Sequence, residues 1–192
     1  MPFVGRTFSN DWDQLFFMQH YGIPTRLLDW TENPFVALYF ALSSGPRDKK
    51  GEPTADASVL LSDPIAWNRA ALSLVSFAGG ILDETSTQIQ SYKPGSDFID
   101  MYSLPVMMHG THNSPRIVAQ RGVFCLFGQE AKSMEKVAED GAFPDGALQK
   151  ILIKKENVLP FLVSLYRKGF VESVIYPDIQ GLAAEMKRSF GY

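Results

Sequence analysis

The sequence has one cysteine, little net charge and no long hydrophobic run. Because Cys125 stands alone in an apolar stretch, it cannot form an internal disulfide and is expected to be a buried thiol, which favours a reducing, cytoplasmic setting. The formal net charge of −3 gives no electrostatic support for nucleic-acid binding. No stretch approaches the roughly 18 to 20 apolar residues that a membrane-spanning helix needs, so no membrane partner is expected.

Several well-known functional motifs are also missing. The sequence has no GxxxxGK[ST] loop, no GxGxxG, no GxSxG and no HExxH. His109 and His112 are three residues apart, but no third ligand accompanies them, so no metal site is expected. These absences argue against P-loop nucleotide hydrolases, dinucleotide-binding α/β folds, elbow-type serine hydrolases and zinc proteases.

The residue pattern predicts an α+β fold. Its 192 residues, 45% of them hydrophobic, suit a single mixed domain over residues 1–192. We expect two N-terminal helices packed on a small, largely antiparallel sheet, followed by C-terminal helices. Apolar spacing predicts helices at 11–19, 34–43, 156–168 and 179–189, of which 34–43 is apolar on nearly every side and therefore buried. Strands are predicted at 57–61 (buried), 148–153 and 171–176, the last a short strand or an extended segment. Residues 116–128 are predicted as one strand interrupted near Arg121-Gly122, or as two strands joined by a tight turn there, and residues 76–111 as a long, partly irregular excursion.

The most unusual stretch is the turn at residues 19–31, QHYGIPTRLLDWT, between the first two predicted helices. Loops held by rigid elements are where binding and catalytic groups collect. Arg26 and Asp29 form either a buried structural pair or part of a ligand site. His20 is a candidate acid or base, with a capping or core role as the alternative. Tyr21 and Trp30 either stack on a ring-shaped ligand or fill the core.

A second pattern is formed by Arg116, Val118 and Gln120, which would share one face of the predicted strand. A guanidinium beside a carboxamide suits the recognition of phosphate or carboxylate. The alternative is an edge-strand arginine that pairs with an acidic residue. The sequence leaves both interpretations open.

These motifs resemble the FRG domain, a family of bacterial and phage proteins. The resemblance is carried by QHYGIPTRLLDWTENPFVALYFAL at 19–42, RIVAQRGVF at 116–124 and GFVESVIYPDIQGL at 169–182. The family is named after a Phe/Tyr-Arg-Gly motif near its N-terminus. Here the nearest residues, Phe3-Val4-Gly5-Arg6, do not match it, so we expect an FRG-like domain that is N-terminally incomplete. An aromatic-Arg-Gly at a strand end is similar to the first motif of arginine-type ADP-ribosyltransferases, and its loss would remove a cofactor anchor.

Two functions are therefore open. The first is a nucleotide-binding, ADP-ribosyltransferase-like toxin or phage-defence effector that uses NAD or binds another small molecule. The second is a non-catalytic binding or interaction domain in which the motif at 19–31 is structural. In the first, His20 and Gln120 are the catalytic candidates, and the ligand-binding candidates are Gln19, Tyr21, Thr25, Arg26, Asp29, Trp30 and Arg116. The two functions differ in whether Arg26, His20, Arg116 and Gln120 meet in one open polar pocket.

Overall fold

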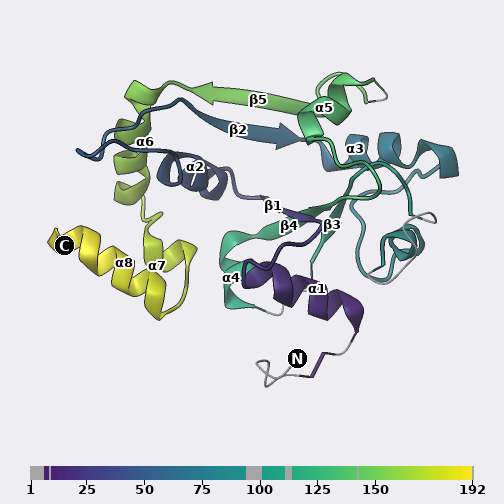
Figure 1. Cartoon of the computed structure of the whole chain (residues 1–192), viewed down its shortest axis with the longest axis horizontal. Coiled ribbons are helices and arrows are strands. Elements are labelled where there is room, and N and C mark those ends of the chain that lie inside the picture. Colours follow the sequence, from purple (N-terminus) through teal and green to yellow (C-terminus); the bar gives the residue numbers. More distant parts are fainter. Residues whose placement is uncertain (1–6, 9, 94–100, 111–113, 142, 192) are drawn as a thin grey trace. The chain divides into compact units, whose positions relative to one another are not determined.

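The computed structural model has the α+β fold that the sequence predicts (Figure 1). It describes residues 7–8, 10–93, 101–110, 114–141 and 143–191, so the segment Phe3-Val4-Gly5-Arg6 lies outside the described residues. The α-helices are α1 (Asp11–His20), α2 (Pro34–Ser43), α3 (Pro64–Ala71), α4 (Pro115–Gln120), α5 (Met134–Glu139), α6 (Lys155–Arg167), α7 (Glu172–Ile175) and α8 (Ile179–Phe190). The strands are β1 (Leu27–Thr31), β2 (Ala57–Ser62), β3 (Val106–His109), β4 (Gly122–Leu126) and β5 (Leu148–Ile153), and two 3₁₀ helices are η1 (Ser73–Val75) and η2 (Thr87–Tyr92).

The chain forms two compact units, and each unit is assembled from separated segments. The first unit comprises Met1–Asp29, Asp63–Thr111 and Val123–Leu148. The second unit comprises Trp30–Ser62, His112–Gly122 and Gln149–Tyr192. The expectation of a single domain over residues 1–192 stays a prediction.

A three-stranded sheet with the order β1-β4-β3 places the predicted motif turn at the start of β1. β3 pairs antiparallel with β4. Phe127 N donates to Arg26 O (2.9 Å), and Glu32 N donates to Arg121 O (3.1 Å). Because the start of β1 thus lies at the end of β4, these two strands also run antiparallel.

Two buried side chains of α3 hold the long excursion that precedes β3. Asn68 Oδ1 accepts from Met107 N (2.7 Å), while Asn68 Nδ2 donates to Met107 O (2.8 Å) and Gly80 O (3.0 Å). Trp67 Nε1 donates to Pro105 O (2.8 Å). The segment predicted to be partly irregular contains two regular pieces, η2 and β3, and the buried side chains of α3 hold its backbone at Gly80, Pro105 and Met107.

The core of the second unit lies between α2 and α6. Val36, Tyr39 and Leu42 of α2 are buried, three residues apart on one face, and they pack in one cluster with buried residues that include Val158, Leu162 and Leu165 of α6. Phe35 is 45% exposed. The second helix is thus buried along one face rather than on every side. The helix begins as expected, with Asn33 Oδ1 accepting from Phe35 N (3.0 Å).

The two-stranded sheet β2-β5 corrects a detail of the prediction. β2 forms as expected, but none of its residues is fully buried, and Leu61 is 40% exposed. The prediction that this strand is buried is therefore wrong. The short apolar run predicts a strand, but it does not tell whether a second layer covers both faces of the sheet.

The predicted strand over 116–128 is wrong in its first half. Residues 115–120 form α4, and a strand begins only at Gly122. Ser114 Oγ accepts from Arg116 N (3.2 Å), and Pro115 occupies the first turn of the helix. Arg121 then ends α4 in a left-handed conformation with φ 47°. The cap and the proline are standard signals for a helix start, and they outweigh the Val and Ile content of this segment.

The predicted strand over 171–176 is also wrong, because α7 occupies Glu172–Ile175. Ile175 N donates to Val171 O (3.0 Å), which closes one helical turn. This turn buries Ile175 completely in the cluster formed with α2 and α6. The β-branched residues favour a strand, but packing in the core decides the conformation.

Candidate functional site

Gln19 organises the turn between α1 and β1. Its Nε2 donates to Asp29 Oδ1 (3.1 Å), and its Oε1 accepts from Thr25 Oγ1 (2.5 Å). Thr25 Oγ1 in turn accepts from Leu27 N (3.0 Å). These bonds join the last turn of α1 to both ends of the loop. Gln19, Thr25 and Asp29, three of the predicted ligand-binding residues, are therefore bonded to one another within the first unit.

Arg26 bonds to main-chain carbonyls of the first unit. Its Nη2 donates to Tyr92 O (2.7 Å) and its Nη1 to Phe127 O (3.2 Å), while Nη1 also approaches the sulfur of Met101. Burial lowers the pKa of Arg26 despite the opposing effect of Tyr92. Among the described residues Asp29 bonds to Gln19, and Arg26 makes no ion pair with it. Arg26 thus ties the start of β1 to η2 and to the end of β4.

His20 and Tyr21 lie on the outer side of the same turn. Tyr21 is 66% exposed, and its ring lies 4.6 Å from that of Phe17 and 4.9 Å from that of His20 (centroid to centroid). His20 is the last residue of α1 and is partly buried. The exposed ring of Tyr21 offers a surface on which an aromatic ligand can stack.

The guanidinium of Arg116 packs against the ring of Tyr176. The guanidinium carbon lies 4.8 Å from the ring centroid, a cation–π distance. Burial raises the pKa of Tyr176, and the charge of Arg116 opposes this shift. In the part of the chain that the structure describes, the side-chain N–H groups of Arg116 have no hydrogen-bond or ion-pair partner. The flat face of the guanidinium thus contacts the ring, and its N–H groups stay available to a ligand.

Gln120 lies one turn after Arg116 on α4. Its Nε2 donates to Ile175 O (3.0 Å), and its main-chain oxygen accepts from Thr31 Oγ1 (2.6 Å). Residues i and i+4 of a helix share a face. Arg116 and Gln120 therefore share a face, but on a helix and not on the predicted strand, and Val118 does not share that face because residues i and i+2 of a helix point in different directions.

The predicted site residues are divided between the two units. Those from Gln19 to Asp29 belong to the first unit, whereas Trp30, Arg116 and Gln120 belong to the second. Trp30 is partly buried, and its indole nitrogen is buried without a hydrogen-bond partner among the described residues. Each group of residues is thus organised locally.

Residues that were not predicted as site residues also contribute. Tyr176 holds Arg116 but lies far along the chain from it, so no local spacing relates the two. Glu172 and Arg188 are also far apart in the sequence but in contact in the structure, where Arg188 Nε lies 2.8 Å from Glu172 Oε1. The guanidinium of Arg188 lies 4.0 Å from the ring centroid of Tyr166. One sequence signal could have pointed to Tyr176. It lies in the segment GFVESVIYPDIQGL, which carries part of the family resemblance.

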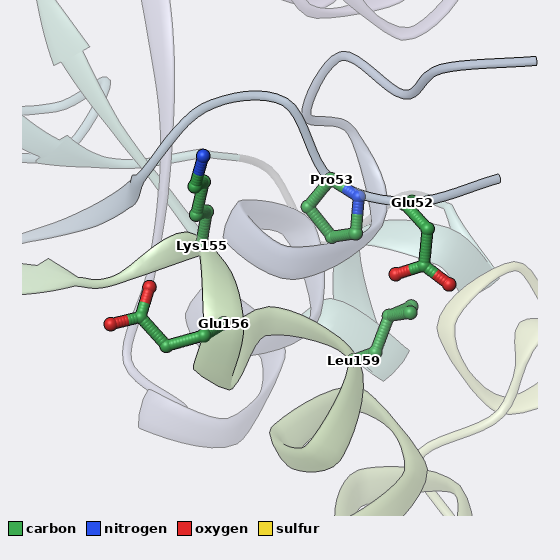
Figure 2. Close-up of a pocket in the computed structure, with 5 residues that line it drawn as sticks. All are labelled: Glu52, Pro53, Lys155, Glu156 and Leu159. Atoms are coloured by element: carbon green, nitrogen blue, oxygen red, sulfur yellow. The ribbon is translucent and has the colours of Figure 1, made fainter. Parts of the chain in front are cut away.

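A shallow pocket of about 220 Å³ lies in the second unit at the start of α6. Figure 2 shows Glu52 and Pro53, from the loop before β2, opposite Lys155, Glu156 and Leu159 of α6. No predicted site residue lines this pocket. Its mixed charges point to no particular ligand.

The described residues show neither a metal-binding cluster nor a membrane-spanning helix. Within them, no group of three or more His, Cys, Asp or Glu side chains could hold a metal ion. His112, one of the two closely spaced histidines, lies outside the described residues. In the same part of the chain, no helix has the length and apolar character needed to cross a membrane.

Comparison with known families agrees with the resemblance noted in the sequence. The family profile described as the FRG domain matches residues 3–50, which contain the whole motif at 19–31. Searches of curated proteins and of solved structures each gave no significant match. The segments at 116–124 and 169–182 lie outside the matched residues. Over residues 3–50 the chain is thus similar to the FRG domain.

Proposed function

We propose that this protein binds a nucleotide through its second unit, with a phosphate group on Arg116. The observation that carries the proposal is the arginine held over Tyr176 at 4.8 Å with its donor edge unbonded within the described residues. A stacked guanidinium loses little conformational freedom on binding, and its planar fork matches two phosphate oxygens. Trp30 of the same unit supplies an aromatic surface of the kind that bases stack on.

Arg26 has a different role in this proposal. Its bonds to Tyr92 O and Phe127 O occupy donors that a phosphate would need. A phosphate on Arg26 would have to displace these bonds and leave two carbonyls unpaired. Arg116 is therefore the better phosphate ligand of the two predicted arginines.

An enzymatic form of the proposal is an ADP-ribosyltransferase-like effector of phage defence, or a toxin, with NAD as its substrate. Gln120 supports this form because its amide is fixed through Nε2 by Ile175 O, so that Oε1 has a defined position beside Arg116 on α4. His20 is the second catalytic candidate, and belongs to the first unit. NAD is accordingly the nucleotide to test first.

A second candidate function is a non-catalytic binding domain in which the motif at 19–31 is structural. The observation that favours it is the bonding of Gln19, Thr25 and Arg26 within the first unit. These side chains hold the loop in one conformation and do not need a ligand to be satisfied. In this case the motif marks the fold of the family and not its chemistry.

Thermal unfolding with a panel of ligands tests the proposal. The panel contains NAD, ADP, ATP, GTP and inorganic phosphate, and the proteins are the wild type, Arg116→Ala and the control Arg167→Ala. Arg167 is an exposed arginine of α6 in the same unit. We expect a nucleotide to raise the melting temperature of the wild type and the control but not of Arg116→Ala. No shift with any nucleotide in the wild type would refute nucleotide binding and favour the second candidate, or a different ligand.

A further inference from the structure

The indole nitrogen of Trp30 is a buried donor that lacks a hydrogen-bond partner within the described residues. Trp67 shows the usual arrangement in this protein, because its buried indole N–H donates to Pro105 O (2.8 Å). Buried polar groups in native proteins are nearly always bonded, so an exception calls for an explanation. Ligand-binding sites are one place where donors without a hydrogen-bond partner in the protein are retained.

The position of Trp30 places it close in the fold to α4. The next residue, Thr31, donates from Oγ1 to Gln120 O (2.6 Å), and Glu32 N donates to Arg121 O (3.1 Å). The end of β1 therefore runs along the end of α4. Arg116 lies one turn earlier on that helix. Trp30 and Arg116 thus belong to the same unit and to neighbouring elements of it.

We infer that the indole N–H of Trp30 donates a hydrogen bond to the bound nucleotide. This inference rests on the proposed function and adds to it a second polar contact besides Arg116. The acceptor would be an oxygen of the phosphate or ribose, or an acceptor atom of the base, all of which nucleotides offer. A site built to donate such a bond discriminates against ligands that lack the acceptor.

The substitution Trp30→Phe separates this role from packing. Phenylalanine keeps an aromatic ring at the position but has no N–H group. We expect calorimetry to show affinity for the nucleotide selected by thermal unfolding about tenfold lower in Trp30→Phe. The unliganded variant should keep its far-UV circular dichroism, because the lost N–H has no hydrogen-bond partner among the described residues that would be left unpaired.

Nuclear magnetic resonance gives a test in the wild-type protein that does not depend on whether the variant folds. The chain has three tryptophans, so the ¹H–¹⁵N spectrum contains three indole signals, which Trp12→Phe and Trp67→Phe assign by elimination. On nucleotide addition we expect the Trp30 signal to move downfield while that of Trp67 stays in place.

The outcomes are distinguishable. If the wild type binds a nucleotide, but the Trp30 signal does not move and Trp30→Phe binds equally well, the inference is overturned and the proposed function stands. If the wild type binds no nucleotide, both are overturned. A moved Trp30 signal together with weaker binding by Trp30→Phe supports both.

Discussion

At the scale of single residues, two arginines predicted as ligand-binding differ in how their donors are used. Arg26 donates to two main-chain carbonyls, whereas Arg116 rests on Tyr176 and makes no side-chain hydrogen bond with the described residues. A hydrogen bond to a charged group contributes roughly 1.5–3 kcal/mol. Arg26 is therefore expected to stabilise the fold, and Arg116 to contribute mainly to binding.

The substitution Arg26→Ala tests the first half of this contrast. It leaves Tyr92 O and Phe127 O without their donor, so we expect the free energy of unfolding to fall by about 2–3 kcal/mol in urea titrations. Arg26→Lys should recover less than half of the loss, because one ammonium cannot reproduce the arginine fork. The exposed Arg167→Ala serves as a control. Unchanged stability in Arg26→Ala would argue that Arg26 is available to a ligand after all.

Whether the predicted residues bind a ligand stays a prediction, and the sequence did not reveal the bonding partners that the structure gives them. Glycine, proline and the density of polar groups at 19–31 marked a turn, which the structure limits to residues 21–26 because Gln19 and His20 belong to α1 and residues 27–31 form β1. The proposed pairing of Arg26 with Asp29 was based on their spacing, and the structure instead pairs Asp29 with Gln19. The carbonyls that bind Arg26 come from Tyr92 and Phe127, and main-chain acceptors so far away leave no mark in the residue pattern.

At the scale of helices and strands, capping residues were more informative than composition. Asn33-Pro34 correctly predicted the start of α2, and the same arrangement at Ser114-Pro115 begins α4, where Val and Ile content had predicted a strand. α7 had no comparable signal in its sequence. Its conformation is set by Ile175, which reaches the core cluster through one helical turn.

The close approach of α7 and α8 depends on Gly181. A methyl group at this position would overlap Tyr176 O and contact Glu172 O. Alanine favours a helix by about 1 kcal/mol over glycine, so a purely local effect would make Gly181→Ala stabilising. We expect it instead to lower the free energy of unfolding by more than about 2 kcal/mol in urea titrations. Gly45→Ala, where nothing lies within 4 Å of the added atom, is the control. A stabilised Gly181→Ala would contradict the described helix contact.

The ion pair between Glu172 and Arg188 also joins α7 to α8, and it predicts a pH dependence. Burial acts to raise the pKa of Glu172, but the hydrogen bond and charge of Arg188, together with hydrogen bonds from the main chain and Tyr166, outweigh it, and the pKa lies below its usual value. A carboxyl with a lowered folded-state pKa stabilises the fold above its unfolded-state pKa of about 4.3, and this contribution is lost as the pH falls through the folded-state value.

We therefore expect Arg188→Gln to destabilise the protein by about 1–2 kcal/mol at pH 7 and by much less near pH 3. Urea unfolding at several pH values measures this difference. Lys187→Gln, a neighbouring exposed substitution, is the control. A loss that does not change with pH would mean that the stacking of Arg188 on Tyr166, and not its charge, holds α8.

At the scale of the whole molecule, the family match does not coincide with a folding unit. Residues 3–29 of the match fall in the first unit and residues 30–50 in the second. α2 lies within the match, but its core partners Val158, Leu162 and Leu165 lie near the other end of the chain. The sequence predicted the α+β class correctly, whereas the division into interleaved units depends on contacts between distant segments.

The fragment Met1–Ser62 tests this view of the fold. It keeps the matched residues but loses α6, so the apolar face of α2 has no partner. We expect weak helical circular dichroism and no cooperative thermal transition. A cooperative transition would show that the matched segment folds by itself.

The most direct test of the central claim is calorimetric titration of the full chain with NAD and ADP. For the wild type and for Arg167→Ala we predict saturable binding of at least one of them, and for Arg116→Ala an affinity at least about tenfold lower, equivalent to about 1.4 kcal/mol. Arg116→Lys should recover little, because lysine lacks the planar fork that stacks on Tyr176. Equal binding by the wild type and Arg116→Ala, or no binding by the wild type, would contradict the proposed role of Arg116.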